Sequence, residues 1–219
     1  MIPIRDHNPS GRTPYVTYSL IGLNVAVFVY MFFLGETGLR QFIEQYAMIP
    51  AKIIAGQSLL TMLTAMFLHG GLAHIIGNML FLNIFGDNLE DRFGHVRYFG
   101  FYLLAGLAGS ALQVAINPSS TIPNLGASGA IAGVMGGYLV LFPRERIDVL
   151  WTFGFLGVST VPASAMLFYW ILFQFIAGAG SFASQGGGVA YFAHIGGFAF
   201  GYLVTRLFVK AKPTIARWV

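Results

Sequence analysis

The sequence predicts an all-α fold, that of a polytopic membrane protein with six membrane-spanning helices. The first observation is composition: 56% of the residues are hydrophobic and only 9% are charged, whereas soluble domains usually carry about 25% charged residues. The second is a series of apolar runs, and the third is the one-sided placement of basic residues between them. Residues 1–219 are interpreted as a single domain with short tails at about 1–15 and 210–219.

The apolar runs supply the six predicted spans. A full crossing needs about 20 apolar residues. The first, third and sixth runs approach this length, whereas the shorter second, fourth and fifth are expected to begin below the membrane surface, shielded by their neighbours. No secretory signal is predicted before them. The runs are Val16–Leu34, Leu72–Phe85, Val96–Ile116, Ser128–Phe142, Val161–Ala177 and Val189–Val209.

Basic residues set the expected orientation. Of the twelve Lys and Arg residues, only Arg40 and Lys52 fall on one side of the predicted spans, and the others fall on the opposite side. Cytoplasmic loops are enriched in Lys and Arg, so both termini are predicted to be cytoplasmic in a multi-pass protein of the cell membrane. The net charge of +4 follows from this placement and does not indicate nucleic-acid binding.

The segment Gly35–Gly71 is expected on the outer side, and it contains many apolar residues. Two interpretations stay open for it. It could lie in the membrane interface as an amphipathic segment, or it could be an outer loop packed on the protein.

Four polar side chains interrupt the apolar runs. Ser128 opens the fourth run, His194 lies in the sixth, and His74 and Asn78 lie in the second. Polar groups in a membrane usually face the bundle interior and mark a functional site. Helical rise places the four about 14–22 Å from the inner ends of their helices. They are therefore compatible with one shared site in the middle and outer part of the membrane.

Glycine spacing predicts that the fourth and sixth helices pack closely. Small residues four positions apart let two helix backbones approach each other in a membrane. Such a seam would bring Ser128 and His194 within reach of each other. The glycines assigned to helix packing near the site are Gly126, Gly129, Gly133, Gly197 and Gly201.

The residue types at this site indicate acyl-transfer chemistry. Ser128 is the candidate nucleophile and His194 the candidate base, since a neutral imidazole can accept the hydroxyl proton. All eight Asp and Glu residues fall in loops or at helix ends, so a dyad is predicted rather than a triad. The oxyanion would be stabilised by His74 and Asn78, which share a helix face, and by the backbone N–H of Ser128 at a helix start.

Each feature also has a purely structural interpretation. Ser128 could cap its helix, His194 could be a hydrogen-bonded interior histidine, and His74 with Asn78 could join neighbouring helices. Their conjunction favours catalysis. The chain has no cysteine and no carboxylate is expected in the site, so neither a metal nor another cofactor is predicted.

The motifs around these residues resemble those of the rhomboid intramembrane serine proteases, of the bacterial six-helix type. The resemblance covers the chain from the first to the sixth span. The stretches that carry it are His69–Asn78, Glu90–Gly94, Gly126–Gly129 and Ala193–Gly197 followed by Gly201.

The resemblance implies a six-helix rhomboid-like bundle and a serine endopeptidase with Ser128 and His194 as its catalytic dyad. It implies oxyanion stabilisation by His74, Asn78 and the N–H of Ser128. It also implies partners, namely transmembrane protein substrates within the lipid bilayer, cut near the outer leaflet. The fifth run and the loop Ser181–Gly188 would be the gate and the cap of the site.

Two departures from the family pattern affect the prediction. Many members have a Trp-Arg pair in the first outer loop, where this chain has Leu39-Arg40. Some have a tyrosine four residues after the serine, where this chain has Ala132. Another group must therefore orient the histidine, and Tyr191 and Tyr138 are the candidates.

Two alternative functions compete with proteolysis. A non-catalytic rhomboid-like binder of transmembrane helices would not need both Ser128 and His194. A small transporter would need a polar path through to the cytoplasm, but the inner halves of the predicted helices are mostly apolar. The sequence therefore favours the intramembrane protease.

Overall fold

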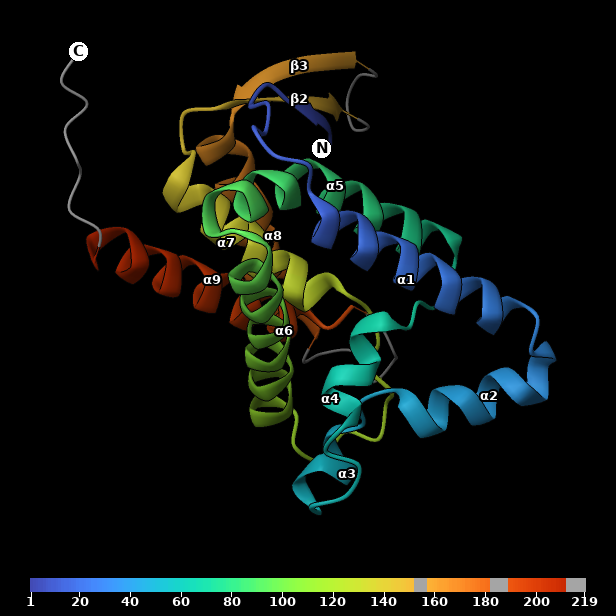
Figure 1. The fold of residues 1–219 in the computed structure, drawn as a ribbon. Coiled ribbons are helices and arrows are strands. Elements are labelled where there is room, and N and C mark those ends of the chain that lie inside the picture. Colours follow the sequence, from blue (N-terminus) through green and yellow to red (C-terminus); the bar gives the residue numbers. More distant parts are fainter. Residues whose placement is uncertain (152–156, 182–188, 212–219) are drawn as a thin grey trace, which may run out of the picture.

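The structure is a computed structural model that describes residues 1–151, 157–181 and 189–211. Helices form most of the described chain, and a small sheet covers one end of the bundle (Figure 1). In chain order the elements are β1 (Ile2–Asp6), α1 (Tyr15–Phe32), α2 (Gly35–Tyr46), α3 (Pro50–Ile54), α4 (Thr61–Thr64), the 3-10 turn η1 (Ala65–Phe67), α5 (Leu72–Phe93), α6 (His95–Ile116), α7 (Ser128–Leu141), β2 (Arg146–Trp151), β3 (Gly157–Pro162), α8 (Ala163–Ser181) and α9 (Tyr191–Ala211).

Each of the six predicted apolar runs coincides with a helix, namely α1 and α5 to α9. Within the described residues, α1, α6, α8 and α9 are long and apolar enough to cross a membrane. A fifth span results if Thr61–Phe67 and α5, which meet at a 94° bend, are taken as one. Helix α7 has 14 residues and is shorter than a full span. The fold is thus that of a helical membrane protein, and the count of six crossings stays a prediction.

The prediction of an all-α fold is corrected by an antiparallel sheet with the strand order β1-β2-β3. β1 lies in the segment interpreted as the N-terminal tail, and β3 includes the predicted start of the fifth span, so α8 begins at Ala163. These strands are too short to contain an apolar run of the length that predicts a membrane span. In β2 the β-branched Ile147 and Val149 are fully buried, and such residues favour strands that pack on a core.

Asp148 in the central strand joins the whole sheet. Its carboxylate accepts hydrogen bonds from Arg5 Nη2 at 2.7 Å and His7 Nε2 at 2.9 Å on the β1 side. It also accepts one from Thr160 Oγ1 of β3 at 2.7 Å. The hydrogen bonds from Thr160, His7 and Arg5 hold the pKa of Asp148 well below its usual range. One carboxylate therefore ties the N-terminus to the strand that leads into α8.

Helix α7 is the centre of the bundle. Every residue from Gly129 to Tyr138 is buried, and α7 packs against α5, α6, α8 and α9. A short helix can lie here because its surroundings are protein side chains, as the shielding of the fourth run predicts. Tyr138 reaches the sheet, where its hydroxyl donates to Asp6 Oδ2 at 2.9 Å.

Helices α7 and α9 approach each other closely at glycine positions. At Gly201, a side-chain methyl group would overlap the backbone of Gly133, and at Gly197 it would overlap that of Gly129. The two helices can approach this closely only because these positions have no side chain.

Glu90 near the end of α5 caps the start of α1. Its buried carboxylate accepts hydrogen bonds from the backbone N–H groups of Val16 at 2.8 Å and Thr17 at 2.7 Å. It also accepts from the Thr17 hydroxyl at 2.7 Å and from His95 Nδ1 at 2.6 Å. A carboxylate at a helix N-terminus satisfies N–H groups that have no partner within the helix.

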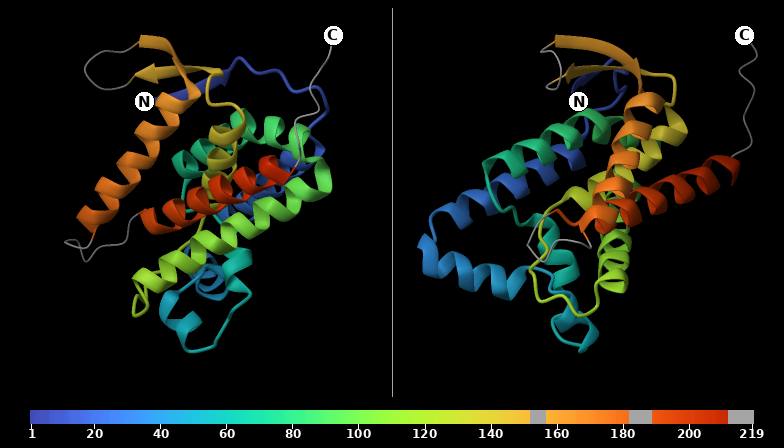
Figure 2. Two further views of the ribbon diagram at one scale, coloured as in Figure 1. Left: turned by 90° about the vertical axis from the view of Figure 1, so that its left-hand side faces the viewer. Right: turned by 180° about the vertical axis from the view of Figure 1, so that it is seen from behind.

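The segment Gly35–Gly71 folds into α2, α3, α4 and η1. Apolar side chains of α2 pack on a small cluster formed by Met31, Ala47 and Leu68, as the packed-loop interpretation predicts. Leu39 belongs to this contact, so apolar packing anchors the loop where the Trp-Arg pair is missing. Both views in Figure 2 place this segment at the end of the molecule opposite the sheet.

Candidate active site

The candidate site lies where three helices begin, away from the sheet. Ser128 is the first residue of α7, and His74 and His194 lie in the first turns of α5 and α9. α7 runs from this site toward the sheet, since β2 follows α7 after a short connection (Figure 1). The structure therefore brings together side chains from three helices that the sequence assigned to one site.

Ser128 and His194 are hydrogen-bonded to each other. The serine Oγ lies 2.7 Å from Nε2 of the imidazole. Helix α7 has Ala127 as its N-cap residue and no side-chain cap hydrogen bond, so Ser128 does not act as the cap. His194 is 8% exposed, whereas Ser128 is partly accessible. A buried imidazole is thus held against the hydroxyl of a partly exposed serine.

The other ring nitrogen of His194 contacts Gln174 of α8, a residue that sequence reasoning missed. Nδ1 lies 2.8 Å from Oε1 of Gln174. The candidates Tyr191 and Tyr138 do not fill this role: Tyr138 bonds to Asp6, and the partner of Nδ1 in the described chain is the glutamine. The available signal was an amide inside the apolar run Val161–Ala177, the same signal that identified Asn78.

His74 and Asn78 lie across a cavity from Ser128. The cavity has a volume of about 900 Å³ and is lined by His74, Asn78, Ser128 and His194, among other residues. Asn78 Nδ2 donates to His69 Nε2 at 2.9 Å, which uses one of the two N–H bonds of that amide. The predicted oxyanion residues therefore share the cavity with the serine.

Gly126 lets His74 approach the chain just before Ser128. Its φ of +131° is a backbone conformation that residues with side chains rarely adopt. A Cβ at this position would lie 2.8 Å from His74 Nε2, which is too close for an ordinary contact. Gly126 is therefore required by both its conformation and its neighbour.

His69, which opens the family-like stretch His69–Asn78 before the start of α5 and has no role in the predicted site, is part of the same cluster. It is 1% exposed, and its ring meets that of His74 edge to face at a centroid distance of 5.1 Å. By accepting from Asn78 it fixes the orientation of that amide.

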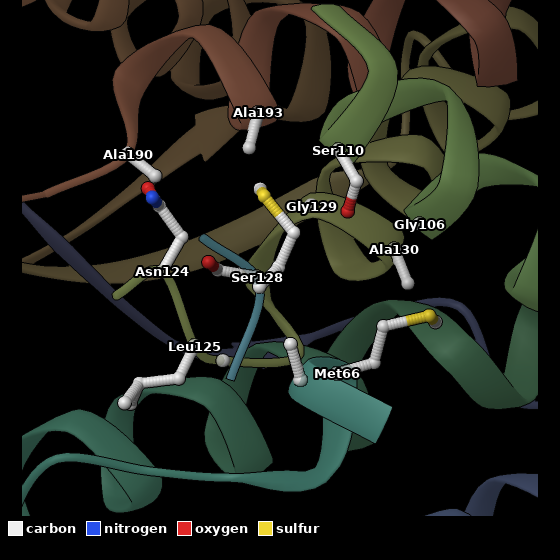
Figure 3. A pocket seen from close by; sticks show the side chains of 13 residues that line it. Met66, Gly106, Ser110, Asn124, Leu125, Ser128, Gly129, Ala130, Ala190 and Ala193 are labelled. Atoms are coloured by element: carbon white, nitrogen blue, oxygen red, sulfur yellow. The ribbon is translucent and has the colours of Figure 1, made fainter. Parts of the chain in front are cut away.

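Two smaller cavities adjoin Ser128. One, of about 230 Å³, extends between α5, α7 and α8 and is lined mostly by apolar side chains such as Phe81, Met135 and Phe173. The other has a volume of about 30 Å³, and Asn124 and Ser110 add polar groups to its wall (Figure 3). Since one water needs about 10–15 Å³ of such space, the smaller cavity has room for one or two waters.

The predicted cap of the site, the loop Ser181–Gly188, lies outside the described residues apart from Ser181. The predicted gate corresponds to α8, which packs on α9 and α7 and exposes Phe168, Leu172 and Ile176 on its outer side. Among the described residues, no group of three His, Cys, Asp or Glu side chains could hold a metal ion.

The fold and the site together define a helical membrane protein in which a buried histidine is hydrogen-bonded to a partly exposed serine at the start of a helix. Comparison with known proteins identifies the family. The model of the rhomboid domain matches residues 56–211, which is more than half of the chain, and the chain belongs to the rhomboid family.

Individual relatives agree with this assignment. The chain is 35% identical over 153 residues to RHOMBOID-like protein 4 of Arabidopsis thaliana. It is 30% identical over 208 residues to the mitochondrial Rhomboid protein 1 of Saccharomyces cerevisiae. It is 31% identical over 141 residues to the rhomboid protease GluP of Bacillus subtilis.

These relatives are longer than the matched region. The three alignments cover 70%, 90% and 64% of this chain, but only 35%, 54% and 27% of the respective relatives. The chain thus spans between a quarter and just over half of their length.

Proposed function

We propose that the protein is an intramembrane serine endopeptidase that hydrolyses peptide bonds in or near transmembrane segments of membrane-protein substrates. The observation that carries the proposal is the 2.7 Å hydrogen bond between Ser128 Oγ and His194 Nε2. It occurs in a chain of the rhomboid family, and a relative from Bacillus subtilis is named a rhomboid protease.

Acylation begins when the Ser128 oxygen attacks the carbonyl carbon of the scissile bond. His194 Nε2 takes the hydroxyl proton as the C–O bond forms, and the carbonyl oxygen becomes an oxyanion. When the C–N bond breaks, the imidazolium returns this proton to the leaving amine. The products of this step are the acyl-enzyme on Ser128 and the new amino terminus.

The oxyanion would be stabilised from two directions. The backbone N–H of Ser128 lies in the first turn of α7, where N–H groups have no partner within the helix and the helix dipole favours negative charge. His74 and the second N–H of Asn78 are the side-chain donors, since both residues line the cavity in front of the serine. One such donor is typically worth about 3–4 kcal/mol in the transition state.

Deacylation needs water in a region surrounded by apolar helices. The cavity of about 30 Å³ that Ser128 helps to line can hold one or two waters and has polar groups in its wall. His194 would take a proton from the attacking water and return it to Ser128 Oγ as the acid product leaves. This restores the resting hydrogen bond.

The proposed location is the cell membrane, with cytoplasmic termini and the site toward the outer leaflet. The basic residues that predict this orientation include Arg5 and Arg146, which lie in the sheet. The candidate site lies at the other ends of α5 and α7. If the sheet faces the cytoplasm, as the excess of positive charge favours, the serine lies in the outer half of the membrane.

The alternative is a rhomboid-like binder that holds transmembrane helices without cutting them. The cavity beside α8 would serve such a protein equally well. The alternative gives no reason for a buried imidazole to be held at hydrogen-bonding distance from an accessible serine, and the protease is therefore preferred.

The test is labelling of the detergent-solubilised protein with a fluorophosphonate serine probe, followed by cleavage of a model transmembrane substrate in liposomes. Ser128→Ala and His194→Ala are each expected to abolish both signals while the protein stays folded. Ser119→Ala, at an exposed loop position, is the control and should match the parent. Labelling or cleavage that persists in Ser128→Ala would refute the dyad. A folded parent protein that neither labels nor cleaves in bilayers would favour the binder.

A further inference from the structure

We propose that Gln174 is the positioning residue for His194: it fixes the tautomer and the ring orientation that the base needs. The inference rests on the proposed function for the roles of Ser128 and His194. It concerns the side of the imidazole that faces away from the serine, where hydrolases with a triad use a carboxylate.

The direction of each hydrogen bond in the series His194–Gln174–Trp170 follows from the carbonyl group of Trp170 at its end. Gln174 Nε2 lies 3.4 Å from the carbonyl oxygen of Trp170, and a carbonyl oxygen can only accept. The amide nitrogen therefore points to Trp170, and the amide oxygen, 2.8 Å from His194 Nδ1, must accept a hydrogen from that nitrogen. Nδ1 thus carries the proton in the neutral ring.

This tautomer is the one that a general base requires. With the hydrogen on Nδ1, the lone pair of Nε2 is directed at the Ser128 hydroxyl, 2.7 Å away. In the opposite tautomer Nε2–H would donate to the serine oxygen and could not take its proton. The hydrogen bond to Gln174 is kept when the ring becomes an imidazolium, since Nδ1 donates in both states.

The surroundings hold this arrangement rigidly. Gln174 is 5% exposed, and the indole of Trp170 lies beside the imidazole at a centroid distance of 5.7 Å and an interplanar angle of 34°. Trp170 also stacks on Phe198. In such dry surroundings a donor left without an acceptor is costly. Rotation of the ring away from Gln174 is therefore opposed by both packing and hydrogen bonding.

The direct test is nitrogen NMR of protein labelled with 15N in its histidine rings, because the ring shifts report which nitrogen carries the hydrogen. The His194 signals are assigned by their loss in His194→Ala. The parent is expected to show Nδ1–H. Gln174→Met, which keeps the side-chain length but removes the acceptor, is expected to shift the population toward Nε2–H.

Two further variants keep the test decisive. Gln174→Asn stays polar but ends about 1.5 Å short of Nδ1, so it should shift the tautomer even if the Met variant does not fold. Gln113→Met is the matched control. Gln113 is also buried, and it accepts from the backbone N–H of Ala193 at 3.3 Å without touching the ring. Its variant should keep Nδ1–H.

Kinetics give the functional readout. Gln174→Met is expected to lower kcat by about tenfold to a hundredfold with KM unchanged, since one buried hydrogen bond is lost next to the base. Gln174→Glu still offers an oxygen to Nδ1 and should recover most of the activity.

The tautomer measurement needs no turnover, so it separates this inference from the proposed function. Nδ1–H retained in both Gln174→Met and Gln174→Asn would overturn the positioning role, even in an active protease. A shifted tautomer would support the role, even if the parent cleaved no substrate.

Discussion

Adding one methyl group at Gly197 is expected to inactivate the protein. Gly197 lies one turn after His194, on the face of α9 that meets α7. A Cβ at this position would lie 2.9 Å from the carbonyl carbon of Gly129 and closer still to its oxygen. Both obstacles are backbone atoms next to Ser128, so no side-chain rotation can relieve the overlap.

The size of the effect follows from the overlap. Non-bonded carbon atoms pack best at about 3.5–4.0 Å, so the overlap with the carbonyl carbon alone would move α9 away from α7 by at least roughly 0.6–1.1 Å, and the closer oxygen requires a larger movement. The same movement would lengthen the Nε2–Oγ distance from 2.7 Å to about 3.5 Å, beyond a normal hydrogen bond. An error of about 1 Å in catalytic geometry can cost about a hundredfold in rate. Overpacking itself is expected to cost about 1–3 kcal/mol of stability.

The assay compares Gly197→Ala with Gly100→Ala, using the rate of fluorophosphonate labelling and the thermal unfolding midpoint in detergent. Gly100 lies in α6, and no atom lies within 4 Å of the place that an added methyl group would take. Its variant should therefore label like the parent and unfold no earlier. If Gly197→Ala labels at the parental rate and unfolds at the parental midpoint, the seam has room for a methyl group and the reasoning is wrong.

Two other predictions concern parts of the fold outside the site. Glu90→Gln is expected to lower the free energy of unfolding by about 2–5 kcal/mol. In the parent protein the buried carboxylate accepts from the backbone N–H groups of Val16 and Thr17, and in the variant the amide would turn an N–H group of its own toward these donors. A loss below about 1 kcal/mol in a denaturation assay would contradict this role. Burial raises the pKa of Asp6 to about 6, so the folded state binds this proton more tightly than the unfolded chain. Its contribution to stability should decline as the pH rises from about 4 to 6, and the decline should be absent in Asp6→Asn. If the unfolding midpoint of Asp6→Asn depends on pH in the same way as that of the parent, the raised pKa of Asp6 is refuted.

The main helices and the pair Ser128 and His194 could be predicted from the sequence because polar residues are rare in the apolar segments of a membrane protein. Ser128 and His194 stand out in apolar runs, and the glycine spacing of α7 and α9 indicates which helix faces meet. The structure places the two side chains 2.7 Å apart. Residues of this kind can be identified without coordinates because each carries a local signal.

The partner of His194 could not be deduced in the same way. Gln174 carries the polar-in-apolar signal, but only the packing of α8 on α9 decides that its amide meets Nδ1. Tyr138 was an equally reasonable candidate by sequence, yet it extends to the sheet and bonds to Asp6. The sheet itself was missed for a related reason. Its strands are short, and the contact of Arg5 with Asp148 joins segments with no local pattern in common.

The sheet imposes an order on biosynthesis. Arg5 and Asp148 are 143 residues apart, so β1 leaves the ribosome long before its partner strand exists. Pairs so distant in sequence form late, because the chain between them must first be brought together. β1 can therefore pair only after β2 has been made, and β3, the next strand in the chain, continues directly into α8, the helix that carries Gln174.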